Sequence, residues 1–239
     1  MKKHLLYIII LSFFFSCKED VKIEFSEANI ETSEDADISI NFPKATGNKD
    51  ASELINSTIQ NYIISQTNLS EDSLTNLTIE DAVKRFNTEF NNFKNDFPDS
   101  PQKWEAFIDG EVTYRSPEVI CIAINTYLDT GGAHGNTNIK FFNFDSQTGK
   151  LYSKADLITD VQALSEIIEN TLKNHVKSDS GESMENFFFG KDFQLPESIG
   201  FSDEGLIVLY NPYEIASYSQ GIIEFTISFE EISSFLNIN

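Results

Sequence analysis

The hydrophobic period of this chain changes from helix-like to strand-like near Pro101, and this change limits the folds that are open to it. Before Pro101, residues 78–97 predict one amphipathic helix, in which Thr78 and Asp81 have the spacing of a capping box. Its apolar side chains recur at three- and four-residue intervals, so we expect them to pack against a sheet. These side chains are Ile79, Ala82, Val83, Phe86, Phe90, Phe93 and Phe97.

After Pro101, three strand-like runs cover residues 104–114, 118–128 and 138–145. Their close spacing predicts an antiparallel meander. The run 118–128 is apolar on both faces, which indicates a central strand that is covered on each side.

The remaining periodic segments complete an α+β pattern. Further strands are expected at 38–42, 197–202, 205–210 and 222–228, and further helices at 51–66, 160–176 and 228–235. The sequence therefore predicts an antiparallel β-sheet with amphipathic helices packed on it, in two lobes that share one core. The expected lobes are residues 36–150 and 151–239.

The first sixteen residues have the pattern of a bacterial lipoprotein signal peptide. Lys2 and Lys3 form a positive start, and the apolar run at 5–15 is too short to span a bilayer of about 30 Å. Ser16 then precedes Cys17, which in such proteins becomes the lipid-carrying N-terminus. We therefore expect an exported protein anchored to the outer membrane through Cys17, on its periplasmic or cell-surface side, with 17–35 as a polar tether. An ordinary secretory signal is the alternative.

The charge of the chain restricts its partners. It has 17 Lys and Arg against 38 Asp and Glu, a formal charge of −21, and removal of residues 1–16 would take away two lysines and leave −23. Such a chain repels phosphate backbones, which argues against nucleic-acid binding and favours cationic partners. Its 21 Phe residues also exclude a disordered acidic tail.

If Cys17 carries a lipid, Cys121 is the only other cysteine, so no internal disulfide can form. Its apolar neighbours predict a small buried side chain rather than a reactive thiol.

Two histidines follow the leader, His134 and His175. A charge at a helix C-terminus explains His175. His134 lies in a Gly-rich segment, residues 129–136, where it is either an acid–base or metal-binding residue or a loop side chain bonded to backbone. The second interpretation is favoured, because a zinc site needs three or four protein ligands. No nucleophile elbow, HExxH motif or phosphate-binding loop is present, so no catalytic residue, metal or cofactor is predicted.

Two motifs carry a family resemblance. The first is Tyr-Leu-Asp-Thr-Gly-Gly-Ala-His-Gly at 127–135, followed by Asn-Phe-Asp-Ser-Gln-Thr-Gly-Lys at 143–150. The second spans 204–221 and contains Asn-Pro-Tyr-Glu at 211–214. In order and spacing, from about 36 to 236, the chain resembles the exported module made of domains of unknown function 4163 and 3298.

The resemblance implies an α/β module outside the cytoplasmic membrane. The family includes the outer part of an anti-sigma factor that binds lysozyme, and a non-catalytic part of some peptidoglycan deacetylases. It implies a binding role, with lysozyme, another cationic cell-wall-active protein or peptidoglycan as the expected partner. The motif residues that form the candidate binding site are Thr130, Gly131, Gly132, His134, Asn136, Asn211, Tyr213 and Tyr218.

Two alternatives stay open at the level of sequence. One is an envelope enzyme, a carbohydrate hydrolase or deacetylase, that uses His134 with nearby carboxylates. The other is a structural lipoprotein without a small ligand.

Overall fold

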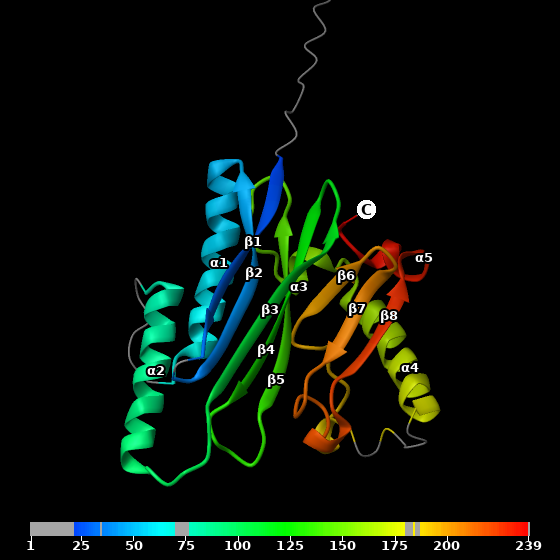
Figure 1. Cartoon of the computed structure of the whole chain (residues 1–239). Helices are drawn as coiled ribbons and strands as arrows, with labels where there is room; N and C mark the ends of the chain where they lie inside the picture. Colours follow the sequence, from blue (N-terminus) through cyan, green and yellow to red (C-terminus); the bar gives the residue numbers. More distant parts are fainter. Residues whose placement is uncertain (1–21, 34, 70–76, 180–183, 185–186, 239) are drawn as a thin grey trace, which may run out of the picture.

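Within the described residues, eight strands form two sheets (Figure 1): a large one in the order β1-β2-β3-β4-β5 and a small one in the order β6-β7-β8. The computed structural model describes residues 22–33, 35–69, 77–179, 184 and 187–238, so the leader and Cys17 lie outside the described residues. The strands are β1 (Ile23–Thr32), β2 (Asp37–Gly47), β3 (Glu105–Arg115), β4 (Val119–Asp129), β5 (Asn136–Asp145), β6 (Ile199–Ser202), β7 (Gly205–Tyr210) and β8 (Ile223–Ser228). The α-helices are α1 (Lys49–Thr67), α2 (Ile79–Asp96), α3 (Lys154–Leu157), α4 (Val161–Asp179) and α5 (Phe229–Ile232).

The α+β class is confirmed, and the meander of β3, β4 and β5 is antiparallel as expected. One pair departs from the antiparallel pattern, because β2 runs parallel to β3, with Asp37 opposite Glu105. The chain between them forms α1 and α2, and a parallel neighbour requires such a long crossover connection.

The prediction of a polar tether at 17–35 is wrong for most of the residues that the structure describes in this range. Residues 23–32 form β1, which pairs antiparallel with β2 from Ile23 opposite Gly47 to Thr32 opposite Ile38. The acidic residues that indicated a tether, Glu24, Glu27 and Glu31, are exposed on this edge strand. Charged side chains on an edge strand prevent pairing with other chains, which explains why an edge strand can read as a polar segment.

Strand β4 separates two hydrophobic clusters that lie on opposite faces of the large sheet. Side chains of one parity (Ile120, Ile122, Ile124) pack with α1 and α2, whereas Val119 and Cys121 pack with α4 and the small sheet. Figure 1 shows the same layers, with α1 and α2 on one side of the large sheet and β6–β8 and α4 on the other. The two halves therefore share the large sheet, which carries one hydrophobic cluster on each face. The expected common core takes the form of these two clusters with the sheet between them.

Besides a single backbone bridge between Phe144 and Leu151, side-chain hydrogen bonds join β5 to the second half of the chain. The Asn211 amide accepts a hydrogen bond from the Ile139 N–H at 2.7 Å and donates to the Ile139 carbonyl at 3.0 Å. The Phe141 N–H donates to the Ser198 hydroxyl at 3.1 Å. These bonds occupy the outer edge of β5, which would otherwise expose backbone donors and acceptors.

The helix ends follow the expectations from sequence except in one case. Thr78 and Asp81 form the predicted capping box of α2. At Ser228, however, the side chain does not cap the backbone of α5, and its hydroxyl donates to the Glu231 carboxylate at 3.0 Å instead. Of the helices in the described ranges, none is long and apolar enough to cross a membrane.

The thiol of Cys121 is buried, as expected. It accepts a hydrogen bond from the Phe201 N–H at 3.3 Å. Burial raises the pKa of this thiol to about 11, which keeps it protonated and unreactive near neutral pH.

Candidate functional site

The loop between β4 and β5 carries His134 and is fixed at its start by two polar side chains. The Asp129 carboxylate accepts a hydrogen bond from the Gly131 N–H at 2.8 Å, and the Gln102 amide donates to the Gly131 carbonyl at 2.8 Å. Gly131 has a φ of +90°, a backbone conformation that L-residues with a Cβ rarely adopt. The glycine is therefore required by the shape of this loop.

A tight turn follows β7 and presents Tyr213 to solvent. The Glu214 N–H donates to the Asn211 carbonyl at 3.0 Å, with Pro212 and Tyr213 at the two central positions. Tyr213 has a φ of +68° and is 55% exposed. A type II turn places its third residue in this region, and glycine or asparagine is usual there. A tyrosine in this position is held by the surrounding structure at a cost of about 1–3 kcal/mol.

The β4–β5 loop, this turn and the short helix that follows it meet, and one ring from each forms what we call the aromatic cluster: His134, Tyr213 and Tyr218. The His134 and Tyr218 rings stack, with centroids 3.7 Å apart and an interplanar angle of 19°. The Tyr213 and Tyr218 centroids are 5.6 Å apart. The Tyr218 hydroxyl donates to the Gly135 carbonyl at 3.1 Å, which ties η3 (Tyr218–Gln220) to the loop.

The ring nitrogens of His134 have neighbours that do not form a catalytic pair. Nδ1 lies 2.8 Å from the Gly135 carbonyl, so it carries the proton in the neutral ring. Nε2 lies 3.5 Å from the Tyr213 hydroxyl. Among the described residues, no carboxylate contacts this ring, and no group of three or more His, Cys, Asp and Glu side chains could hold a metal ion. The contacts match the loop side chain bonded to backbone that the sequence favoured.

Replacing His134 by alanine is therefore expected to change the free energy of unfolding by less than about 1 kcal/mol, because its side chain is exposed and bonds within its own loop. Urea denaturation followed by circular dichroism would measure this. A loss above about 2 kcal/mol would show that the stack on Tyr218 supports the fold.

The eight candidate residues separate into four groups. His134, Tyr213 and Tyr218 form the aromatic cluster, whereas Asn211 is buried and holds β5. Gly131 shapes the loop. The other three lie in the loop or at its end, and within the described residues no hydrogen bond joins them to the cluster: Thr130, Gly132 and Asn136.

Sequence reasoning did not select Tyr127 as a site residue, although it begins the first motif. A Cβ on Gly135 would lie 2.4 Å from the Tyr127 ring, so the ring packs directly on the loop backbone. Burial against the loop, with the negative charges of Asp129 and Glu105, raises the pKa of Tyr127. The signal that could have identified Tyr127 was its place in the first motif, close to the end of β4.

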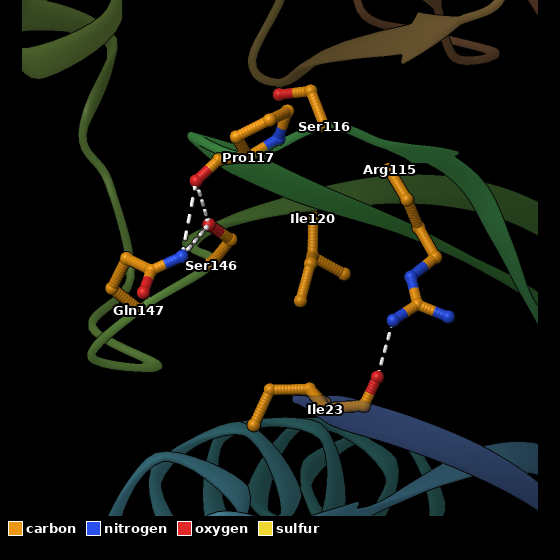
Figure 2. A pocket seen from close by; sticks show the side chains of 7 residues that line it. All are labelled: Ile23, Arg115, Ser116, Pro117, Ile120, Ser146 and Gln147. Atoms are coloured by element: carbon orange, nitrogen blue, oxygen red, sulfur yellow. Dashed lines mark hydrogen bonds between the residues drawn. The ribbon is translucent and has the colours of Figure 1, made fainter. Parts of the chain in front are cut away.

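A hollow of about 210 Å³ lies at the end of β3 and β4 that is opposite to the aromatic cluster (Figure 2), beside Ile23. The Arg115 guanidinium donates to the Ile23 carbonyl and lies 5.5 Å from the centre of the Phe25 ring. On another side of the hollow, the Ser146 hydroxyl and the Gln147 amide donate to the Pro117 carbonyl (Figure 2). These bonds attach the start of β1 and the turn after β5 to the neighbouring ends of β3 and β4.

Comparisons with known proteins agree with the motifs. Residues 155–230 match the family described as "Protein of unknown function (DUF3298)", and residues 30–137 match "Deacetylase PdaC". The chain resembles DUF3298 proteins in sequence and in fold. A DUF3298 crystal structure from Bacteroides fragilis superposes with a TM-score of 0.68 at 17% identity, covering 93% of this chain and 96% of the other.

A DUF3298 protein from Pseudomonas aeruginosa has a TM-score of 0.56, also at 17% identity, and covers 92% of this chain and 96% of its own. At such identities the two structures show the fold alone. No curated protein matches the chain.

Proposed function

We propose that this chain is a non-catalytic binding module of the cell envelope, exported and held at the outer membrane by a lipid on Cys17. The match of its first half to a deacetylase-associated domain and of its second half to DUF3298 supports an accessory role in the envelope. The pattern of residues 1–17 supports export and lipidation.

The aromatic cluster is the observation that carries a binding role. It brings together segments that lie about 80 residues apart in the chain. It also exposes Tyr213, whose positive φ costs energy to maintain. Residues at protein-binding hot spots are enriched in tyrosine, because the ring buries a large area and still offers a hydroxyl. The contacts of His134 give no support to the enzyme alternative.

The charge of the chain favours a cationic partner, and lysozyme or another basic cell-wall-active protein fits this requirement. A formal charge of −23 after leader removal would raise the rate of encounter with such a protein. Peptidoglycan is the second candidate partner, and the module needs no catalytic group for either one.

Titration calorimetry with hen lysozyme tests the proposal. We expect binding at low salt that weakens as salt rises, because part of the attraction comes from charge. Tyr213→Ala should weaken binding about tenfold or more, as expected for a hot-spot tyrosine.

A matched control is Phe97→Ala, which removes another exposed ring, 58% accessible, at the end of α2. This variant should bind lysozyme as the parent does. Absence of binding by the parent at low salt, or equal losses in both variants, would contradict the proposal.

A further inference from the structure

A groove between the two sheets is separate from the aromatic cluster and has a different character. It encloses about 220 Å³ between the face of β3–β5 and strands β7 and β8. Pockets for drug-sized ligands usually measure about 300–1,000 Å³, so this volume suits one ring of a longer, extended ligand. Ile139 and Leu209 contribute to an apolar floor.

The walls of the groove carry negative charge without a counter-ion. Asp109, Glu111 and Glu224 line it, and Asn125 adds an amide opposite Asp109 in the β3–β4 register. Among the residues that the structure describes, no Lys or Arg side chain lines the groove. In the part of the chain that the structure describes, no ion pair or hydrogen bond engages these three carboxylates. They are free to accept hydrogen bonds from ammonium and hydroxyl groups.

Strand geometry places two aromatic rings at one end of this acidic row. Phe107, Asp109 and Glu111 alternate along β3, so their side chains share one face of the sheet. Tyr127 lies opposite Phe107, and the two rings stack with centroids 6.0 Å apart at 12°. Phe107 is 37% exposed, which leaves part of its ring open to a ligand.

We propose that this groove binds a glycan whose sugar units carry free amino groups. The exposed part of the Phe107 ring, which Tyr127 supports from the neighbouring strand, offers an apolar surface for one sugar and a cation–π contact for an ammonium group. The carboxylates of Asp109, Glu111 and Glu224 pair with the amines and accept hydrogen bonds from sugar hydroxyls. An N-acetylated glycan lacks the positive charge, so it forms neither the ion pairs nor the cation–π contact. It keeps only the apolar ring contact and the hydrogen bonds from its hydroxyls.

Calorimetry of the purified protein with a glucosamine pentamer, at mildly acidic pH where its amines are charged, tests this proposal. The N-acetylglucosamine pentamer serves as the comparison ligand, and it should bind at least about tenfold more weakly. The double variant Asp109→Asn/Glu111→Gln should lower affinity for the glucosamine pentamer about tenfold, and Phe107→Ala should lower it several-fold.

The matched control is Glu53→Gln/Glu89→Gln, which removes two charges from α1 and α2 on the other face of the large sheet. It should leave affinity unchanged. Unchanged thermal melting of all variants would exclude loss through unfolding. The proposal is overturned if the control weakens binding as much as the groove variant does. It is also overturned if both pentamers bind equally, if neither binds, or if tetralysine competes as strongly as the glucosamine pentamer.

Discussion

Replacing Phe201 by alanine is expected to lower the free energy of unfolding by about 3–5 kcal/mol, as for other fully buried phenylalanines. Phe201 belongs to β6, and its ring lies 6.2 Å from Phe229, nearly parallel, and 6.2 Å from Tyr114 of β3. Its backbone N–H donates to the Cys121 thiol of β4. The substitution therefore leaves a cavity between the small sheet and the large one.

Urea denaturation followed with two probes would measure the loss in free energy of unfolding. It would also show whether the two hydrophobic clusters unfold together. Trp104 is the only tryptophan, and it packs with Phe86 and Phe90 in the cluster on the opposite face of the large sheet. If the two clusters unfold together, Trp104 fluorescence and far-UV circular dichroism should shift to the same lower midpoint.

The exposed Phe97 provides the control, since Phe97→Ala should change stability by no more than about 0.5 kcal/mol. A Trp104 transition that stays at its original midpoint in Phe201→Ala would show that the halves unfold independently, against the shared-sheet interpretation.

Asn211→Ala is expected to cost about 2–6 kcal/mol, because it leaves two backbone groups without a partner and each such group costs about 1–3 kcal/mol. The substitution removes the acceptor for the Ile139 N–H and the donor to the Ile139 carbonyl. Asn211 itself is only 8% exposed, so water reaches it poorly. Thermal and urea denaturation would both report the loss.

The matched variant is Asn136→Ala, which removes the same amide from an exposed position in the same candidate site. It should be close to neutral in stability, within about 0.5 kcal/mol. Normal melting of Asn211→Ala together with loss of a ligand would instead identify Asn211 as a contact residue. This comparison separates the residues of the motif that hold the fold from those that could touch a partner.

Much of the fold was predictable from hydrophobic period. The Phe stripe of α2 and the two-sided apolar run of β4 both depend on local spacing, and both were confirmed. Strand β1 was missed because Glu24, Glu27 and Glu31 make the segment look like a polar tether rather than a strand with alternating apolar and polar residues. The parallel pairing of β2 with β3 was missed because sequence spacing does not show which strands become neighbours.

The candidate site was only partly predictable. The motifs supplied His134, Tyr213 and Tyr218, and the structure brings these three rings together. It also assigns Asn211 to the support of β5, a distinction that depends on burial and bonding partners. Phe107 and Asp109 lie outside both motifs, and only the register of β3 with β4 places them beside Tyr127 and Asn125.

The sequence by itself determined most of the strands and helices, the strongly acidic charge and the leader pattern, because these depend on residue type and local period. Tertiary structure alone decided that the halves meet across one sheet and that side-chain amides cover the edge of β5. It also decided that a ring cluster lies beside the loop at one end of that sheet and that an acidic groove lies over its middle. The physical reason is that burial, ring stacking and unpaired charge are properties of contacts between segments far apart in the chain, which local spacing does not encode.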